Sequence, residues 1–426
     1  MKHILTIVIL FTLIVGCTPK STSTQTATLA PPTSALTPLA PTVMPSATVK
    51  PASTPNPYLT EKCLEVLPKL PLNAQLPGTL VLGTYYGKTN QAYLLNLQTG
   101  EKIPLRGRDD EILEAFSISP DSRWLAYTST RTKATETDRL VIMGADGKPV
   151  KDRLISTREW IYMDGWVNNQ NLIFEKYDPV NYDPYGGPLA SVVYNPFTTE
   201  QKQLDPDYPD IQTDGERLFD WSYTETVYDP TLSLVVYPRN DRKTMALWDR
   251  QSKREIVRFS RRLFNSEGAI PVWSPDGSVM LKLDTPENAD PSQAELFGMS
   301  RNGTLSQLTY VTNSSPDVLI SSFSWSPDMR HIAFWLSLEP YNDENLAVLD
   351  METKTVTNYC LKGLTHRRNM SGLLSAPMWS PDSNKLLINF PNGEDNSKAV
   401  IVDIDRDYAA KIVDDMLPIG WLTNEP

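Results

Sequence analysis

The segment Met378-Trp-Ser-Pro-Asp382 recurs, with small changes, at three other places in the chain. The other copies are Phe116-Ser-Ile-Ser-Pro-Asp121, Val272-Trp-Ser-Pro-Asp-Gly277 and Ser324-Trp-Ser-Pro-Asp328. In this step proline presets φ for a turn, aspartate accepts hydrogen bonds from its own backbone and glycine tolerates a positive φ. We therefore expect a tight chain reversal at each copy, with the tryptophan packed between neighbouring repeats.

An alternating apolar strand follows each reversal, over Trp124–Tyr127, Val279–Leu283, His331–Trp335 and Lys385–Phe390. Weaker copies stand at Gly165-Trp166 and Asp220-Trp221. The anchor positions are then 118, 166, 221, 273, 325, 379 and 421, which lie 42 to 55 residues apart. That period is typical of a propeller blade with four short strands. The sequence predicts an all-β fold, a seven-bladed β-propeller.

The first predicted blade lacks an innermost strand. Its other three strands are expected at Leu80–Tyr86, Gln91–Leu97 and Lys102–Leu105, whereas the chain ends with an unpaired strand at Leu417–Trp421. We expect this C-terminal strand to complete the first blade and so close the ring, which hides edge strands.

The Trp-Ser-Pro-Asp step followed by a strand resembles the TolB-type, WD-like propeller repeat. The resemblance extends over roughly residues 79 to 423 and is strongest in four of the repeats. It implies the fold and says almost nothing about function.

The N-terminus has the pattern of a secretion signal. Lys2 precedes an apolar run from Ile4 to Val15, which would span only about 18 Å as a helix, less than the roughly 30 Å of a hydrocarbon core. A signal peptide over residues 1–16 is therefore predicted. The junction Ile14-Val15-Gly16-Cys17 resembles a bacterial lipobox, which implies that Cys17 is lipidated. The alternative is an ordinary cysteine in a signal peptide that is cut elsewhere.

Residues 17–57 are expected to form a disordered linker behind the lipidated cysteine. Residues 18–57 contain ten Thr, five Ser, nine Pro and six Ala, with no acidic or aromatic residue. Such a composition buries too little apolar surface to fold. The predicted organisation is a linker, a lead-in segment over 58–78 and a propeller over 79–426, outside the cytoplasm and anchored to the cell membrane or outer membrane of a bacterium.

Composition excludes several function classes. The 426 residues include 40 Lys+Arg and 51 Asp+Glu, and the net charge of −11 argues against a nucleic-acid partner. Three Cys and three His leave little material for a metal site, so no metal, cofactor or catalytic group is predicted. The stretch Asp205–Glu216 loosely resembles a calcium loop, but Asp210 stands where glycine is needed.

Two cysteines, Cys63 and Cys360, remain in the predicted folded part. In an oxidising compartment they could pair and pin the lead-in segment to the ring. Two separate free thiols are the alternative.

Loop lengths differ between the two predicted faces of the ring. The turns between first and second strands and between third and fourth strands are short and define the short-turn face. The remaining loops are long and define the long-loop face, where propellers commonly place recognition. Tentative binding residues in or beside those loops are Arg158, Trp160, Tyr177, Tyr182, Tyr185, Arg261, Arg262, His366, Arg367 and Arg368. Neutral variation of surface loops is the alternative.

The leading hypothesis is a non-catalytic binding or scaffolding protein, whose partner is an unknown protein or an envelope polysaccharide held on the long-loop face. Its other partner is the membrane, through the N-terminal lipid. A hydrolase or lyase that acts on glycans with loop carboxylates is the second hypothesis. A third is an accessory that completes a larger complex.

Overall fold

In a computed structural model of the chain, the described residues are 58–423 except 72, 73, 75, 77, 85–90, 106–110, 132–137, 157–159, 178–189, 205–225, 240–242, 261–269, 288, 291–292, 314–317, 338–343, 363, 365–374 and 392–396. They are almost entirely β-structure. The helical structure among them is a single 3₁₀ turn, Val311–Asn313, and none of their helices is long and apolar enough to cross a membrane.

Five antiparallel sheets have four strands each. The first contains β29 (Leu417–Leu422), β2 (Thr79–Gly83), β3 (Ala92–Asn96) and β4 (Lys102–Leu105). The next contains β5 (Glu111–Ile118), β6 (Leu125–Arg131), β7 (Asp138–Met143) and β8 (Pro149–Ser156). It is followed by β9 (Trp160–Trp166), β10 (Leu172–Tyr177), β11 (Ala190–Tyr194) and β12 (Gln201–Leu204). The last two sheets contain β13 (Val227–Tyr228), β14 (Leu234–Pro238), β15 (Thr244–Asp249) and β16 (Arg254–Ser260), then β17 (Val272–Trp273), β18 (Val279–Asp284), β19 (Glu295–Ser300) and β20 (Leu305–Gln307).

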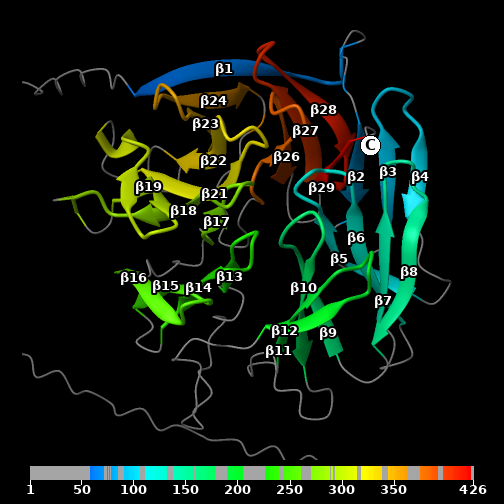
Figure 1. Ribbon diagram of the computed structural model, residues 1–426. Coiled ribbons are helices and arrows are strands. Elements are labelled where there is room, and N and C mark those ends of the chain that lie inside the picture. The colour runs from blue at the N-terminus through cyan, green and yellow to red at the C-terminus, as the bar shows by residue number, and fades with distance from the viewer. Residues whose placement is uncertain are drawn as a thin grey trace, which may run out of the picture. The chain divides into compact units, whose positions relative to one another are not determined.

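A sixth sheet has nine strands, because β1 (Leu59–Leu67) joins two four-stranded runs. One run contains β21 (Leu319–Trp325), β22 (His331–Ser337), β23 (Asn345–Asp350) and β24 (Val356–Lys362). The other contains β25 (Met378–Trp379), β26 (Lys385–Pro391), β27 (Ser397–Asp403) and β28 (Tyr408–Asp414). The β1 strand lies beside β24 and reaches β28 (Figure 1).

The sheets follow one another around a ring. The first strand of each run stands at the inner edge, and inner strands of neighbouring sheets contact one another: β29 contacts β5, β5 contacts β9, β17 contacts β21, β21 contacts β25 and β25 contacts β29. Each hydrophobic cluster among the described residues is filled from two consecutive four-stranded sheets or runs. The core therefore lies between the sheets, which is the architecture of a β-propeller.

The chain end closes this ring, as the sequence predicts. The β29 strand pairs antiparallel with β2, so that Trp421 lies opposite Leu80 and Leu422 opposite Thr79. Trp421 is 2 % exposed and packs with Leu80 and Leu387, from the first and the last sheets.

The repeated Ser-Pro-Asp step forms the predicted reversal. At Ser274 the hydroxyl donates to Asp276 at 2.6 Å and accepts from the backbone N–H of Val279 at 3.1 Å. Gly277 has a φ of +70°. Trp273, Trp325 and Trp379 pack at the junction with the preceding sheet, as expected.

In one repeat the anchor position is filled by a residue that the sequence does not predict. The predicted anchor Trp221 lies outside the described residues, and the innermost described strand of that repeat is β13. Tyr228 pairs with Val235 there, as Trp273 pairs with Met280. The anchor is missed in the sequence because Asp229 replaces the serine of the repeated step: its carboxylate accepts from the N–H of Leu234 at 2.6 Å.

The lead-in segment over residues 58–78 contains a strand that the sequence does not predict. The β1 strand pairs parallel with β24 over seven residue pairs, from Leu59–Val356 to Glu65–Lys362. Cys63 and Cys360 are partners in this register and form a disulfide with a Cα–Cα distance of 4.4 Å. The lead-in segment is thus fastened to the outer edge of the ring.

Candidate functional site

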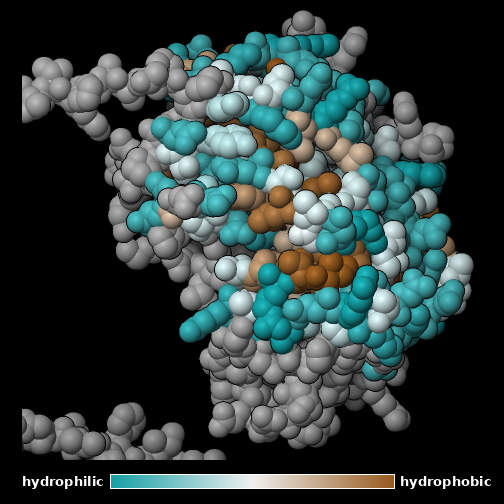
Figure 2. Space-filling model, turned by 60° about the vertical axis from the view of Figure 1, so that its left-hand side comes forward, coloured by the Kyte–Doolittle hydropathy of each residue, from teal (hydrophilic) through white to brown (hydrophobic). Residues whose placement is uncertain are grey.

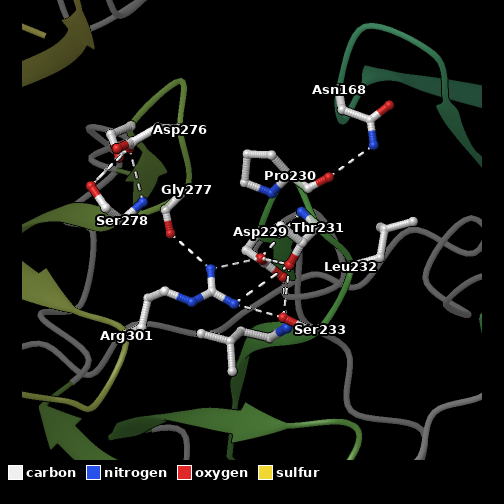
Figure 3. A network of polar contacts seen from close by, with 12 residues as sticks. Asn168, Asp229, Pro230, Thr231, Leu232, Ser233, Asp276, Gly277, Ser278 and Arg301 are labelled. Atoms are coloured by element: carbon white, nitrogen blue, oxygen red, sulfur yellow. Dashed lines mark hydrogen bonds and ion pairs between the residues drawn. The ribbon is translucent and has the colours of Figure 1, made fainter.

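The short-turn face is held together by hydrogen bonds between turns of neighbouring sheets (Figure 3). The Asn168 amide donates to the carbonyl of Pro230 at 2.8 Å, and the Asp121 N–H donates to Asn169 at 2.9 Å. The Asp328 N–H donates to Ser383 at 3.1 Å between the two four-stranded runs of the nine-stranded sheet. Each of these bonds joins a side chain of one turn to a backbone group of the neighbouring turn, so the face has a structural role.

An ion pair strengthens the same face. Arg301 donates to Asp229 at 2.9 Å, to the carbonyl of Gly277 at 2.8 Å and to Ser233 at 2.6 Å (Figure 3). Asp229 is fully buried and also accepts from Thr231. The arginine therefore neutralises a buried charge and joins two sheets.

The inner strands β5 and β9 each contain a β-bulge between the long-loop end and the short-turn end of the strand. In β5 the register with β6 shifts between Leu113 and Phe116, which leaves Glu114 without a strand partner. In β9 the register with β10 skips Asp164. Bulges redirect side chains and are common beside binding sites.

Two neighbouring inner strands expose the same kinds of side chain. Ile112 is 37 % exposed and Tyr162 is 55 % exposed, each two residues before an exposed carboxylate, Glu114 or Asp164. The β5 and β9 strands contact each other, and the backbone N–H of Trp166 donates to the Ser117 hydroxyl at 3.1 Å. An apolar residue and a carboxylate are thus presented twice, near the long-loop ends of adjacent strands. These four residues are called the inner acidic patch below.

The backbone of β9 approaches a side chain of β5 closely at Gly165. Gly165 has a φ of +132°, and a Cβ atom there would lie 2.6 Å from the Ser117 hydroxyl. Only glycine fits such a position between two strands.

Asp164 has an unusual protonation equilibrium. Desolvation of the carboxyl group by the protein around it and, second, the negative charge of Glu175 raise the pKa of Asp164 to about 8, although part of the residue is exposed to solvent. Glu175 is 5 % exposed. At neutral pH Asp164 is therefore mostly protonated, so it can donate a proton or a hydrogen bond.

The neighbouring sheet holds a second acidic group that is already neutralised. The Glu111 carboxylate accepts from Arg139 at 3.1 Å and from Ser129 at 3.0 Å, and Arg139 also pairs with Asp152. Burial raises the pKa of Tyr127, in the same cluster of charges, to about 12. Glu111 is thus committed to a structural role.

Within the described residues, one group has the side-chain types and spacing of a metal site, namely Glu61, Cys63 and Cys360. Its cysteines are joined in the disulfide, so they offer no thiolate to a metal in this state.

Few of the tentative binding residues can be placed. Trp160 begins β9 and Tyr177 ends β10, and the two are partners in the strand register at the long-loop end. Outside the described residues are Cys17, Arg158, Tyr182, Tyr185, Arg261, Arg262, His366, Arg367 and Arg368, and also the calcium-like stretch Asp205–Glu216.

Sequence reasoning missed the inner acidic patch. Ile112, Glu114, Tyr162 and Asp164 lie within strands, and the search for function concentrated on loops. The alternation of apolar and acidic residues at 112/114 and 162/164, before two successive anchors, is the signal that could have found it.

No family model matches the chain, and no curated protein matches it. Several solved structures are similar. TolB from Acinetobacter baumannii is 14 % identical, with a TM-score of 0.41 over 87 % of this chain and 98 % of that one. The β-propeller domain of Cps50 (Swd1) from Myceliophteria thermophila is 12 % identical, with a TM-score of 0.40 over 74 % and 94 %. An oligogalacturonate lyase in complex with manganese is 11 % identical, with a TM-score of 0.45 over 81 % and 85 %. At these values none of the similarities bears on function.

Proposed function

We propose that the chain is a bacterial lipoprotein outside the cytoplasm, anchored to a membrane through Cys17, with a seven-bladed, TolB-like propeller that binds a partner without catalysis. The lipid and the linker rest on the sequence of residues 1–57. The blade number is supported by the five four-stranded sheets and the two four-stranded runs beside β1.

The observation that carries the binding function is the inner acidic patch. Ile112 and Tyr162 are exposed large hydrophobic residues, and Glu114 and Asp164 are exposed carboxylates on the same two strands. A few polar groups among apolar and aromatic surface are typical of ligand sites. An aromatic ring can lie against a sugar ring or an apolar side chain, while carboxyl groups bond hydroxyl or amide donors.

The partner class that fits this chemistry is a protein segment or an envelope polysaccharide approaching from the long-loop face. The short-turn face is the weaker candidate, because several of its polar side chains already bond backbone groups or side chains of the neighbouring turn.

The test is recovery of the lipidated, full-length protein from its native envelope after crosslinking. We expect a stoichiometric partner with the wild type and at least a tenfold loss with Tyr162→Ala or Asp164→Asn. Gln251→Ala, an exposed change in a short turn, is the matched control and should keep the partner. A partner recovered equally with all variants would contradict the proposed face.

A second function is favoured by one observation, the raised pKa of Asp164, to which the negative charge of Glu175 contributes. A carboxyl group with a pKa of about 8 is protonated at neutral pH, and the strand beside it holds the buried carboxyl group of Glu175. Glycan hydrolases and related enzymes divide acid and base roles between two such groups. Turnover of a glycan panel by the wild type, lost in both Asp164→Asn and Glu175→Gln, would establish this alternative. Binding of a glycan without turnover would exclude it for that glycan.

A further inference from the structure

A hollow lies at the junction between β8 and the following sheet. Its volume is about 50 Å³, and it is lined by Arg153 and Ile155 of β8 and by Phe174, Val192 and Gln201 among residues of the next sheet. One water molecule requires about 10–15 Å³. The hollow therefore has room for several waters or for a small aliphatic side chain.

At the junction between β24 and β28, a side chain of β1 lies between the two outer strands. There Leu64 of β1 belongs to the cluster formed with Leu361 of β24, Ile388 of β26, Val400 of β27 and Ala409 of β28. Leu64 is 4 % exposed. A side chain from an added strand thus fills the space between two outer strands.

The strand registers show that the two junctions correspond. On the following sheet, Gln201 of β12 is the partner of Tyr194, as Ala409 of β28 is the partner of Val402. Tyr194 and Val402 each belong to the cluster that faces the preceding sheet.

The preceding sheets correspond as well. Arg153 of β8 is the partner of Leu140, as Tyr359 of β24 is the partner of Leu346. Leu140 and Leu346 each face the following sheet. The hollow beside β8 is therefore the place that Leu64 fills beside β24.

The edge of β8 also offers backbone groups and apolar surface. Among the described residues no strand is paired beyond β8 in its sheet, whereas β24 has β1 paired along it. Val150 and Leu154 of β8 are 50 % and 49 % exposed. An open edge with exposed apolar side chains is a template for an added strand.

The rim of the hollow differs from the filled junction in charge. Arg153 stands where the other junction has Tyr359, and its guanidinium donates to the Tyr194 hydroxyl at 3.2 Å. Lys151 and Lys202 are on the two outer strands, β8 and β12, in a chain whose net charge is −11. A partner that carries a carboxylate complements this local positive charge.

We propose that the edge of β8 and the hollow beside it dock an extended segment of a partner protein. The segment pairs parallel with β8, as β1 pairs with β24, and places an aliphatic side chain in the hollow. It carries an Asp or Glu that pairs with Arg153. This site is on the outside of the ring and does not depend on the function proposed for the inner acidic patch.

The probe is a library of random twelve-residue peptides displayed on phage, selected against the full-length, oxidised protein. We expect enriched peptides with one aliphatic residue close to an Asp or Glu, which protect amides 149–156 and 201–204 from hydrogen exchange. Arg153→Glu should weaken their binding at least tenfold. Arg254→Glu, at the start of the outer strand β16, is the matched control and should leave binding unchanged.

The proposal is overturned if no peptide is enriched, if enriched peptides protect other segments, or if Arg153→Glu and Arg254→Glu behave alike. The melting temperature of each variant must equal that of the wild type. If Arg153→Glu does not fold, Arg153→Gln is tested in its place, and we expect it to weaken peptide binding by a smaller factor.

Discussion

Arg301 reaches from one sheet to the fully buried carboxylate of Asp229 in the preceding sheet, with 2.9 Å between Nη1 and Oδ2. The pair stands where other repeats have a serine hydroxyl that donates to an exposed aspartate, as Ser274 does to Asp276. One repeat therefore depends on its neighbour for a counter-charge.

Removal of that counter-charge should destabilise the ring. Because Arg301 keeps 38 % exposure, we expect Arg301→Ala to lower the free energy of unfolding by about 2 kcal/mol, less than the roughly 3–5 kcal/mol of fully buried pairs. Urea unfolding measures the change. Lys148→Ala removes an exposed ion pair with Asp146 and should have little effect. Equal effects of the two variants would contradict the structural role of Arg301.

Because the C-terminal strand closes the ring, its loss should destabilise the whole ring. Trp421→Ala empties a buried site between the first and last sheets, and we expect a loss of about 3–5 kcal/mol. Deletion of residues 416–426 should lower the midpoint of the whole unfolding transition. The control is Leu305→Ala, at a side chain that is 39 % exposed. A truncated protein with the parent's midpoint would show that β29 is dispensable.

The Cys63–Cys360 disulfide joins residues 297 positions apart. Cross-links that close long loops stabilise mainly by restricting the unfolded chain, so the double variant Cys63→Ser, Cys360→Ser should lose about 2–4 kcal/mol. A thiol assay on denatured, unreduced 58–426 protein should detect no free thiol. Detection of two thiols per chain would contradict the bond.

The raised pKa of Asp164 predicts how the free energy of unfolding changes with pH. Its pKa rises from 3.8 in the unfolded chain to about 8 in the folded one. Between these values the folded state holds a proton that the unfolded state has released, so stability falls as pH rises from about 4 to 8. We expect Asp164→Asn to remove this part of the slope. Parallel unfolding curves of wild type and variant from pH 5 to 9 would contradict the shifted pKa.

Most of the fold could be predicted from the repeats in the sequence. Period and turn residues located the sheets, and the incomplete first repeat predicted the pairing of β29 with β2. The exception was Asp229, because a carboxylate there performs the task of serine and disguises the repeat.

Two other features of the structure, the β1 strand and the β-bulges, could not be predicted from the repeat period of the sequence. The β1 strand stands outside the repeats, and its partner β24 is almost 300 residues away, so nothing local specifies the pairing. The bulges at Glu114 and Asp164 depend on contacts between neighbouring inner strands, such as that of Gly165 with Ser117. These features decide which side chains are exposed, and therefore where a ligand can bind.

The exposed residues also explain why loops alone are a poor guide to the site. On the face that Figure 2 shows, most residues are hydrophilic and the hydrophobic ones gather near its middle. Ile112 and Tyr162 are exposed hydrophobic residues within strands, and neither stands out in a search of loop composition.

Photo-crosslinking from a single position tests the binding face most directly. A photoreactive phenylalanine analogue replaces Tyr162 in the full-length protein, and in a second strain it replaces Gln251 on the short-turn face. After illumination of the native envelope, we predict a discrete crosslinked product from position 162 and none from position 251. A product from position 251 alone, or the same product from both, would contradict recognition at the inner acidic patch.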